Sequence, residues 1–97
     1  MSVKVGINGF GRMGRLALRV GWEMPEIEFI QINEIATDAV GSAHLLKFDS
    51  AHGTWLQDTT AENQQIHINQ KRIDHTSNSV IGDTDWSGCD IVIEATG

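Results

Sequence analysis

Three glycines fall within six positions in the run Gly9–Gly14 (GFGRMG), and this spacing restricts the possible folds more than any other feature of the chain. A β-branched run precedes the glycines, with Val3, Val5 and Ile7 ending at Asn8, and predicts a first strand. After them, apolar residues recur at helical spacing, which predicts an amphipathic helix that ends near Gly21. The glycines therefore occupy a turn between a strand and a helix.

The predicted helix presents one apolar stripe, which we expect to face the core. Its members stand at i, i+3, i+4 and i+7 and are Met13, Leu16, Ala17 and Val20. The following Pro25 disfavours helical geometry at the residue before it and so supports an end of the helix there.

In a strand-to-helix turn of this kind, the first glycine allows the tight turn, the second lets the backbone approach a diphosphate, and the third lets helix and strand pack closely. The free amides at a helix N-terminus attract anions. An acid, Glu34, stands 34 − 14 = 20 positions after the last glycine, the spacing expected of a residue that binds ribose hydroxyls. This combination favours a dinucleotide site over the alternative of a purely steric glycine turn.

Glu34 also bears on the choice of dinucleotide. A carboxylate accepts hydrogen bonds from ribose hydroxyls but repels a 2′-phosphate, and no arginine lies between Gln31 and Lys47 to neutralise one. We therefore expect NAD rather than NADP. The alternative is that Glu34 is only a solvated acid at a strand end.

The rest of the chain continues the alternation of strands and helices. We expect a second strand over Ile27–Ile32, a second helix over Ala39–Phe48, a β-hairpin that turns at Asn69-Gln70, and a last strand over Ile91–Ile93. This order predicts an α/β fold with a mostly parallel sheet and a hairpin insert. Because parallel sheets need cover on both faces and only two helices are predicted, the fold is expected to be incomplete within this chain.

Composition excludes several classes of protein. The chain has 97 residues, enough for one domain, and 13 acidic against 7 basic residues give a formal charge of −6, which disfavours a nucleic-acid binder. No apolar run approaches the roughly 20 residues that span a bilayer, so we expect no membrane partner and a cytoplasmic location. A single cysteine, Cys89, and four histidines without ligand spacing predict no metal site.

Four segments resemble the amino-terminal part of the phosphorylating glyceraldehyde-3-phosphate dehydrogenases: VKVGINGFGRMGRL, INE, HLLKFDSAHG and DIVIEATG. The resemblance implies that residues 1–97 are the amino-terminal part of a Rossmann-type NAD-binding domain and that the catalytic domain is absent from this chain. It also implies a homotetramer that oxidises a small aldehyde phosphate with NAD and adds inorganic phosphate. The segments NEI and HLLKFDSAHGTW are closer to a subgroup associated with arsenic resistance, in which arsenate replaces phosphate.

The resemblance also implies cofactor-binding residues. Arg12 and Met13 would present backbone amides to the diphosphate, Asn33 and Glu34 would hold the adenosine end, and Thr96-Gly97 would line the nicotinamide side. With the glycine turn, the full set is Gly9, Phe10, Gly11, Arg12, Met13, Gly14, Asn33, Glu34, Thr96 and Gly97. Without the resemblance, Arg12 would be a surface residue, Met13 a core residue and Thr96-Gly97 a turn.

This sequence departs from the family pattern at three positions. Glu34 stands where aspartate is common, Ser79 where many members have a basic residue beside the adenine, and Gln70 where the hairpin usually has glycine.

No catalytic residue is predicted within the chain. The chemistry of the family needs a cysteine thiolate and a histidine, and the cysteine-bearing motif Ser-Cys-Thr-Thr-Asn is not present. Cys89 lacks that context and is expected to be structural. Two other functions stay open: an erythrose-4-phosphate dehydrogenase, and a nucleotide-binding module without catalysis.

Overall fold

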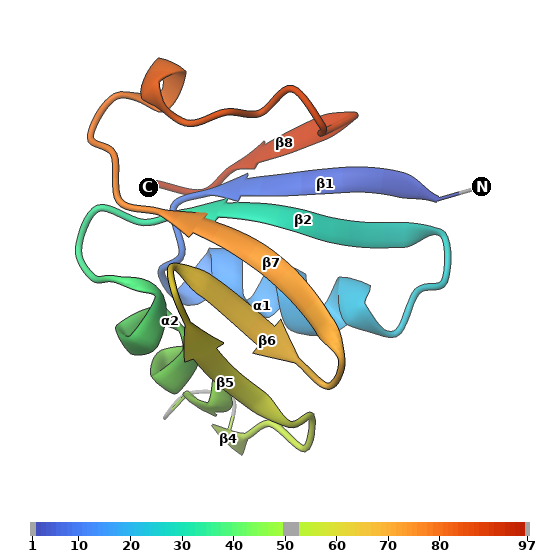
Figure 1. The fold of residues 1–97 in the computed structure, drawn as a ribbon. Coiled ribbons are helices and arrows are strands. Elements are labelled where there is room, and N and C mark those ends of the chain that lie inside the picture. Colours follow the sequence, from blue (N-terminus) through green and yellow to red (C-terminus); the bar gives the residue numbers. More distant parts are fainter. Residues whose placement is uncertain (1, 50–52, 97) are drawn as a thin grey trace.

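The computed structural model describes residues 2–49 and 53–96, which form a six-stranded mixed sheet, a small two-stranded antiparallel sheet and two α-helices (Figure 1). The elements in chain order are β1 (Val3–Asn8), α1 (Arg12–Trp22), β2 (Ile27–Asn33), α2 (Ala39–Lys47), β3 (Phe48–Asp49), β4 (Gly53–Thr54), β5 (Thr59–Glu62), β6 (Gln65–Ile68), β7 (Lys71–Thr76), the 3-10 turn η1 (Ile81–Asp83) and β8 (Ile91–Glu94). No helix in the described part of the chain is long and apolar enough to cross a membrane.

The main sheet has six strands in the order β5-β6-β7-β2-β1-β8. Strands β7, β2, β1 and β8 run parallel, whereas β5-β6 and β6-β7 pair in antiparallel fashion. This arrangement confirms the predicted α/β class, with a parallel part and a hairpin insert. All four parallel strands end at the same edge, so the residues that follow them lie near one another.

The insert has one strand more than the sequence analysis predicted. The turn at Asn69-Gln70 is confirmed, because Ile68 pairs with Lys71 on either side of it. A second hairpin joins β5 to β6 through Asn63 and Gln64, both with positive φ, of 51° and 62°. Such φ values suit a tight hairpin turn but are uncommon for residues other than glycine and asparagine, so the residue types at this turn did not indicate it clearly.

Helix α1 turns a different face to the core from the one predicted. Its buried residues are Gly14, Leu18 and Gly21, while Met13 and Val20 are 67% and 54% exposed. A Cβ at Gly21 would lie 2.6 Å from the Phe29 ring, so the helix packs on β2 through its glycines. The predicted stripe was wrong because the pattern counted apolar side chains and ignored glycines as packing positions.

One arginine joins the two helices. Arg19 of α1 donates from Nη2 to the carbonyl oxygens of Leu46 (2.6 Å) and Gly53 (2.8 Å) and lies 5.8 Å from the centre of the Trp55 ring. The last carbonyls of a helix have no partner within it, so this guanidinium caps α2. Trp55 in turn packs edge-on against Trp22, at 6.0 Å between ring centres.

The segment between β7 and β8 covers part of the sheet, which the sequence analysis did not anticipate. A Cβ at Gly6 would lie 2.6 Å from the Trp86 ring and 2.8 Å from Cys89 Sγ, so this segment rests directly on β1. Burial raises the pKa of the Cys89 thiol, and the carboxylates of Asp90 and Asp85 raise it further. The cysteine is therefore protonated at neutral pH, as a structural residue would be.

Candidate functional site

A cavity of about 180 Å³ lies at the edge of the sheet where the parallel strands end. Its lining comes from the ends of β1, β2 and β8 and from the loop after β7, and comprises Asn8, Gly9, Gly11, Asn33, Glu34, Ile35, Asn78, Ser79, Ala95 and Thr96. In open α/β sheets, ligands bind outside the carboxyl ends of the strands. Five of the ten residues predicted from the sequence therefore meet in one cavity: Gly9, Gly11, Asn33, Glu34 and Thr96.

The three glycines of the turn differ in what surrounds them. Gly9 has φ of +96°, and a Cβ there would lie 2.6 Å from the backbone nitrogen of Thr96. A Cβ at Gly14 would collide with the carbonyl oxygen of Gly9 and lie 3.2 Å from Ile7 Cγ2. A Cβ at Gly11 would meet no atom within 4 Å. The fold thus requires the first and third glycines but not the second.

The N-terminus of α1 has free backbone donors. Gly11 is the N-cap residue, no side chain caps the helix, and the first turn contains no acidic residue. The first four amides of a helix have no partner within it and carry partial positive charge. Beside an open position at Gly11, these donors fit the diphosphate of a dinucleotide.

Glu34 contacts the glycine turn directly. Its Oε1 accepts a hydrogen bond from the backbone N–H of Phe10 at 2.6 Å, and its Oε2 accepts one from the N–H of Ala36 at 2.7 Å. Each carboxylate oxygen can accept more than one hydrogen bond, so the side chain retains acceptor capacity on the cavity side. The acid that the spacing identified is therefore also a support of the turn.

Asn33 lies at the centre of a buried hydrogen-bond network and is only 3% exposed. Its Oδ1 accepts from Thr76 Oγ1 (2.6 Å), the backbone N–H of Asn78 (2.8 Å) and Thr84 Oγ1 (3.1 Å). Its Nδ2 donates to Asn8 Oδ1 and to the backbone oxygen of Asn78, both at 2.9 Å. With these bonds its amide is fully used, so Asn33 holds together the loops that form the cavity.

A second set of bonds fixes the end of β8. Glu94 accepts from the Thr96 hydroxyl at 2.6 Å and from Asn8 Nδ2 at 2.9 Å. Both hydrogen bonds lower the pKa of Glu94, and the bond from Thr96 has the larger effect. Because Asn8 also bonds to Asn33, a continuous polar network joins the ends of β8, β1 and β2.

The other predicted site residues that the structure describes are not part of the cavity lining. The Phe10 side chain is buried, at 1% exposed, and its backbone N–H is used by Glu34. Arg12 and Met13 are exposed in the first turn of α1, and Gly14 is buried there. Gly97 lies outside the described residues.

Sequence reasoning missed several residues that shape the cavity, including Ile35 and Ala95 of its lining. Asn8 and Asn78 line it, and Thr84 joins Asn78 to the buried network. Asn8 could have been found, since it ends a parallel strand whose carboxyl end faces the site. Asn78 and Thr84 stand in a polar segment without regular spacing and gave no signal.

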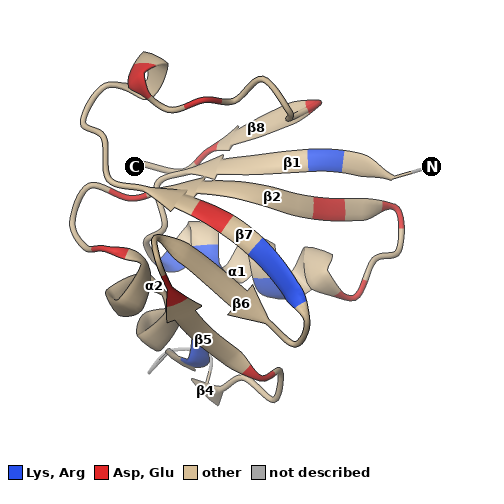
Figure 2. Ribbon diagram, viewed as in Figure 1, with Lys and Arg blue, Asp and Glu red and all other residues tan. Residues whose placement is uncertain are grey.

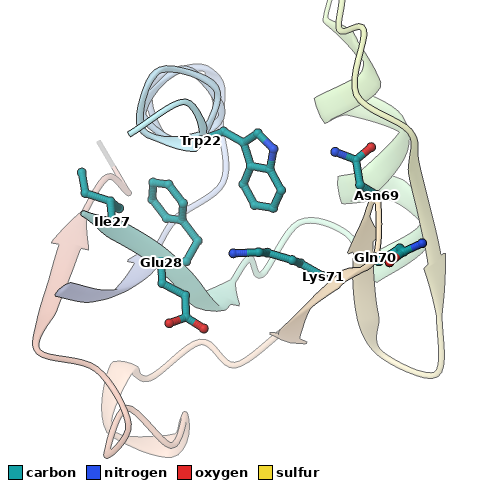
Figure 3. Close-up of a pocket in the computed structure, with 7 residues that line it drawn as sticks. Trp22, Ile27, Glu28, Asn69, Gln70 and Lys71 are labelled. Atoms are coloured by element: carbon teal, nitrogen blue, oxygen red, sulfur yellow. The ribbon is translucent and has the colours of Figure 1, made fainter. Parts of the chain in front are cut away.

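A further cavity, of about 420 Å³, lies at the opposite end of β2 (Figure 3). Trp22 from the end of α1, Glu28 from β2 and Lys71 from the start of β7 line it, where β2 and β7 are no longer paired. None of the predicted site residues lies there. Figure 2 shows basic residues on β1 and at the start of β7, and acidic residues on β2 and further along β7.

One histidine in the described part of the chain, His75, has buried surroundings that affect its ionisation. His75 on β7 is 3% exposed, and its Nε2 lies 2.7 Å from the hydroxyl of Ser42 on α2. Burial lowers the pKa of His75, while Asp38 and Glu34 raise it in part. His52 lies outside the described residues.

Comparison with known proteins identifies relatives over the whole chain. Residues 3–97 match the family model described as glyceraldehyde 3-phosphate dehydrogenase, NAD binding domain. Glyceraldehyde-3-phosphate dehydrogenase 3 of Nostoc sp. is 50% identical over 99 aligned positions, and the enzyme of Heyndrickxia coagulans is 42% identical. Glyceraldehyde-3-phosphate dehydrogenase 1 of Bacillus subtilis is 39% identical. All of this chain is covered in each case, but only 29% of the length of each relative.

Proposed function

Because the chain belongs to the glyceraldehyde 3-phosphate dehydrogenase family, whose NAD binding domain it matches, we propose that the cavity at the carboxyl edge of the sheet is part of the NAD site of such an enzyme. Residues 1–97 form the amino-terminal part of the Rossmann-type domain in this proposal. The erythrose-4-phosphate dehydrogenase alternative uses the same site and differs only in its aldehyde.

The empty space at Gly11 is the observation that carries the proposal. Its φ of −76° is open to any residue, and a side chain there would touch no atom of the protein within 4 Å. Glycine at this position has no role in the fold of the described chain. It keeps the backbone bare where the amides of α1 face outward, which is what a closely bound diphosphate requires.

The chain's own residues have distinct roles in holding the dinucleotide. Backbone amides at the start of α1, around Arg12 and Met13, bind the diphosphate, and Glu34 accepts hydrogen bonds from the adenosine ribose. Asn33 acts through its neighbours, by keeping the loops after β1 and β7 in place. Thr96, fixed by Glu94, lines the cavity and would contact the nicotinamide side of the cofactor. Gly97 lies outside the described residues, and its contact with the nicotinamide stays a prediction from the resemblance. When bound, NAD supplies the acceptor for the hydride of the aldehyde.

Further parts of the proposal concern the whole protein. An enzyme of this family needs a cysteine nucleophile and a histidine base, and neither is assigned among these 97 residues. We propose that they come from the remainder of a protein of the length of its relatives, which acts as a tetramer in the cytoplasm. Its substrates would be a small aldehyde phosphate together with inorganic phosphate or arsenate.

Valine substitutions at two glycines test the proposed NAD site. Gly11→Val should reduce the affinity for NAD, measured by isothermal titration calorimetry, by roughly 100-fold or more, because the added methyl groups occupy the diphosphate position. Gly82→Val is the matched control, since a Cβ at Gly82 also meets no atom within 4 Å but lies in η1, away from the cavity lining. Equal NAD affinity in the two variants would refute the proposal.

A further inference from the structure

The cavity at the other end of β2 exists because the hairpin insert leaves the parallel part of the sheet (Figure 3). Strands β2 and β7 are in register only over Gln31–Asn33 and Asp74–Thr76. Earlier in β7, from Lys71 onwards, the strand pairs with β6 instead. The opening of about 420 Å³ that remains between β2 and β7 is bounded by Trp22 at the end of α1. The topology therefore places this cavity at the opposite end of β2 from the proposed NAD site.

The wall formed by α1 and β2 is apolar and rigid. Trp22 packs edge-on against Trp55, with 6.0 Å between the ring centres. Phe29 is 5% exposed, and a Cβ at Gly21 would lie 2.6 Å from its ring, so helix and ring are in direct contact. Together with Ile27, these side chains give the cavity an apolar wall that needs no ligand in order to form.

The opposite wall, at the turn between β6 and β7, is also held in place. The backbone N–H of Asn69 donates to the carbonyl oxygen of Asp58 at 2.7 Å, and Asn69 Nδ2 donates to Gln57 Oε1 at 2.8 Å. In return, Asn69 Oδ1 accepts from the backbone N–H of Asp58 at 3.2 Å. These hydrogen bonds fix the turn that leads into Lys71, so both walls are preformed.

Lys71 gives the cavity its charge. Its side chain extends from β7 into the cavity beneath the Trp22 ring (Figure 3), and it has no hydrogen bond or ion pair with any residue among 2–49 and 53–96. The acid of the lining, Glu28, points away from Trp22, and its Oε1 accepts from the Ser2 hydroxyl at 3.3 Å. An ammonium without a counter-ion therefore lies beside an aromatic wall.

We propose that this cavity binds a small aromatic carboxylate, with its ring against Trp22 and Phe29 and its carboxylate at the Lys71 ammonium. The volume lies in the range of roughly 300–1,000 Å³ that is typical of small-molecule sites. Aromatic walls favour a flat apolar ring. The cation favours a negative charge, and their attraction is stronger beside apolar walls than in open water. This inference does not rest on the proposed function, because the NAD site uses other residues.

Three probes with the same ring test the choice of ligand. They are indoleacetate, its neutral amide indoleacetamide, and the amine tryptamine, and calorimetry measures the dissociation constant of each. Indoleacetate should bind with a constant of roughly 1 mM or lower, as expected for a ligand of this size. The amide should bind roughly threefold to tenfold more weakly because it lacks the charge, and tryptamine more weakly still because Lys71 repels it. Indoleacetate should also shift the NMR signal of the Trp22 indole N–H.

Substitutions of exposed lysines test the role of the charge. Lys71→Met should lower the affinity for indoleacetate to that for indoleacetamide, and Lys71→Arg, which keeps the charge, should retain most of it. Lys4→Met is the matched control, since Lys4 is an exposed lysine on β1 outside the cavity lining, and it should bind indoleacetate like the wild type. Melting temperatures establish that each variant is folded.

The outcomes separate this site from the proposed NAD site. Absence of indoleacetate binding, equal affinity for the three probes, or unchanged affinity in Lys71→Met overturns the inference. Displacement of indoleacetate by NAD also overturns it, because the two cavities lie at opposite ends of β2. The proposed function is tested by NAD affinity alone and does not depend on any of these results.

Discussion

Replacing Gly14 by alanine should destabilise the protein strongly, although only one methyl group is added. The new Cβ would collide with the carbonyl oxygen of Gly9 and would lie 3.2 Å from Cγ2 of Ile7, a side chain with no exposed surface. Neither neighbour is the flexible end of a side chain, so α1 must move away from β1. Overpacking of this kind reduces the free energy of unfolding by about 2–3 kcal/mol.

Urea unfolding followed by tryptophan fluorescence measures this loss. For a domain of this size, the same change should lower the melting temperature by roughly 10–20 °C. Gly11→Ala is the matched control, because its Cβ would meet nothing within 4 Å and its backbone suits any residue. The free energy of unfolding of Gly11→Ala should stay within about 0.5 kcal/mol of the wild-type value. Equal stability of all three proteins would show that α1 does not rest on β1 as described.

Two further predictions concern parts of the fold outside the cavity. Arg19→Ala should lower the free energy of unfolding by about 2 kcal/mol, because the last carbonyls of α2 lose a charged donor. Urea unfolding measures this loss. The control Arg12→Ala, on the exposed first turn of α1, should change the free energy of unfolding little. The buried His75 should make stability depend on pH. Its pKa is lowered in the folded state, so the unfolded chain takes up a proton first, and the free energy of unfolding should fall as the pH drops below about 6.5, by at most about 1.4 kcal/mol per pH unit. In the double variant Ser42→Ala, His75→Leu the free energy of unfolding should fall less as the pH drops. An identical pH profile in the variant would contradict the assignment of this pH dependence to His75.

The parts of the fold that sequence patterns predicted are those with regular periodicity. The strands β1, β2 and β8 and both helices were predicted close to their observed bounds, since β-branched runs and helical spacing depend on local geometry. Strand β5 was missed because its residues Thr59–Glu62 include no large apolar side chain and its turn lacks glycine.

The candidate site was predictable in outline but not in its network. Glycine spacing and the position of Glu34 located the turn and its acid, because both depend on short stretches of chain. The hydrogen bond from Thr84 to Asn33 spans 51 positions, and nothing local to either residue indicates it. That Asn33 is saturated by its own protein could be learned only from the structure.

The dual use of Glu34 has a consequence for protein engineering. A designer who wishes to admit a phosphorylated ribose would begin by removing this acid, since its charge repels the extra phosphate. The same change would release the backbone N–H of Phe10, which Glu34 holds at 2.6 Å, and would loosen the turn that receives the dinucleotide. Cofactor preference and the rigidity of the turn are therefore coupled in this chain, and a switch of coenzyme requires a replacement acceptor for Phe10 in the same design.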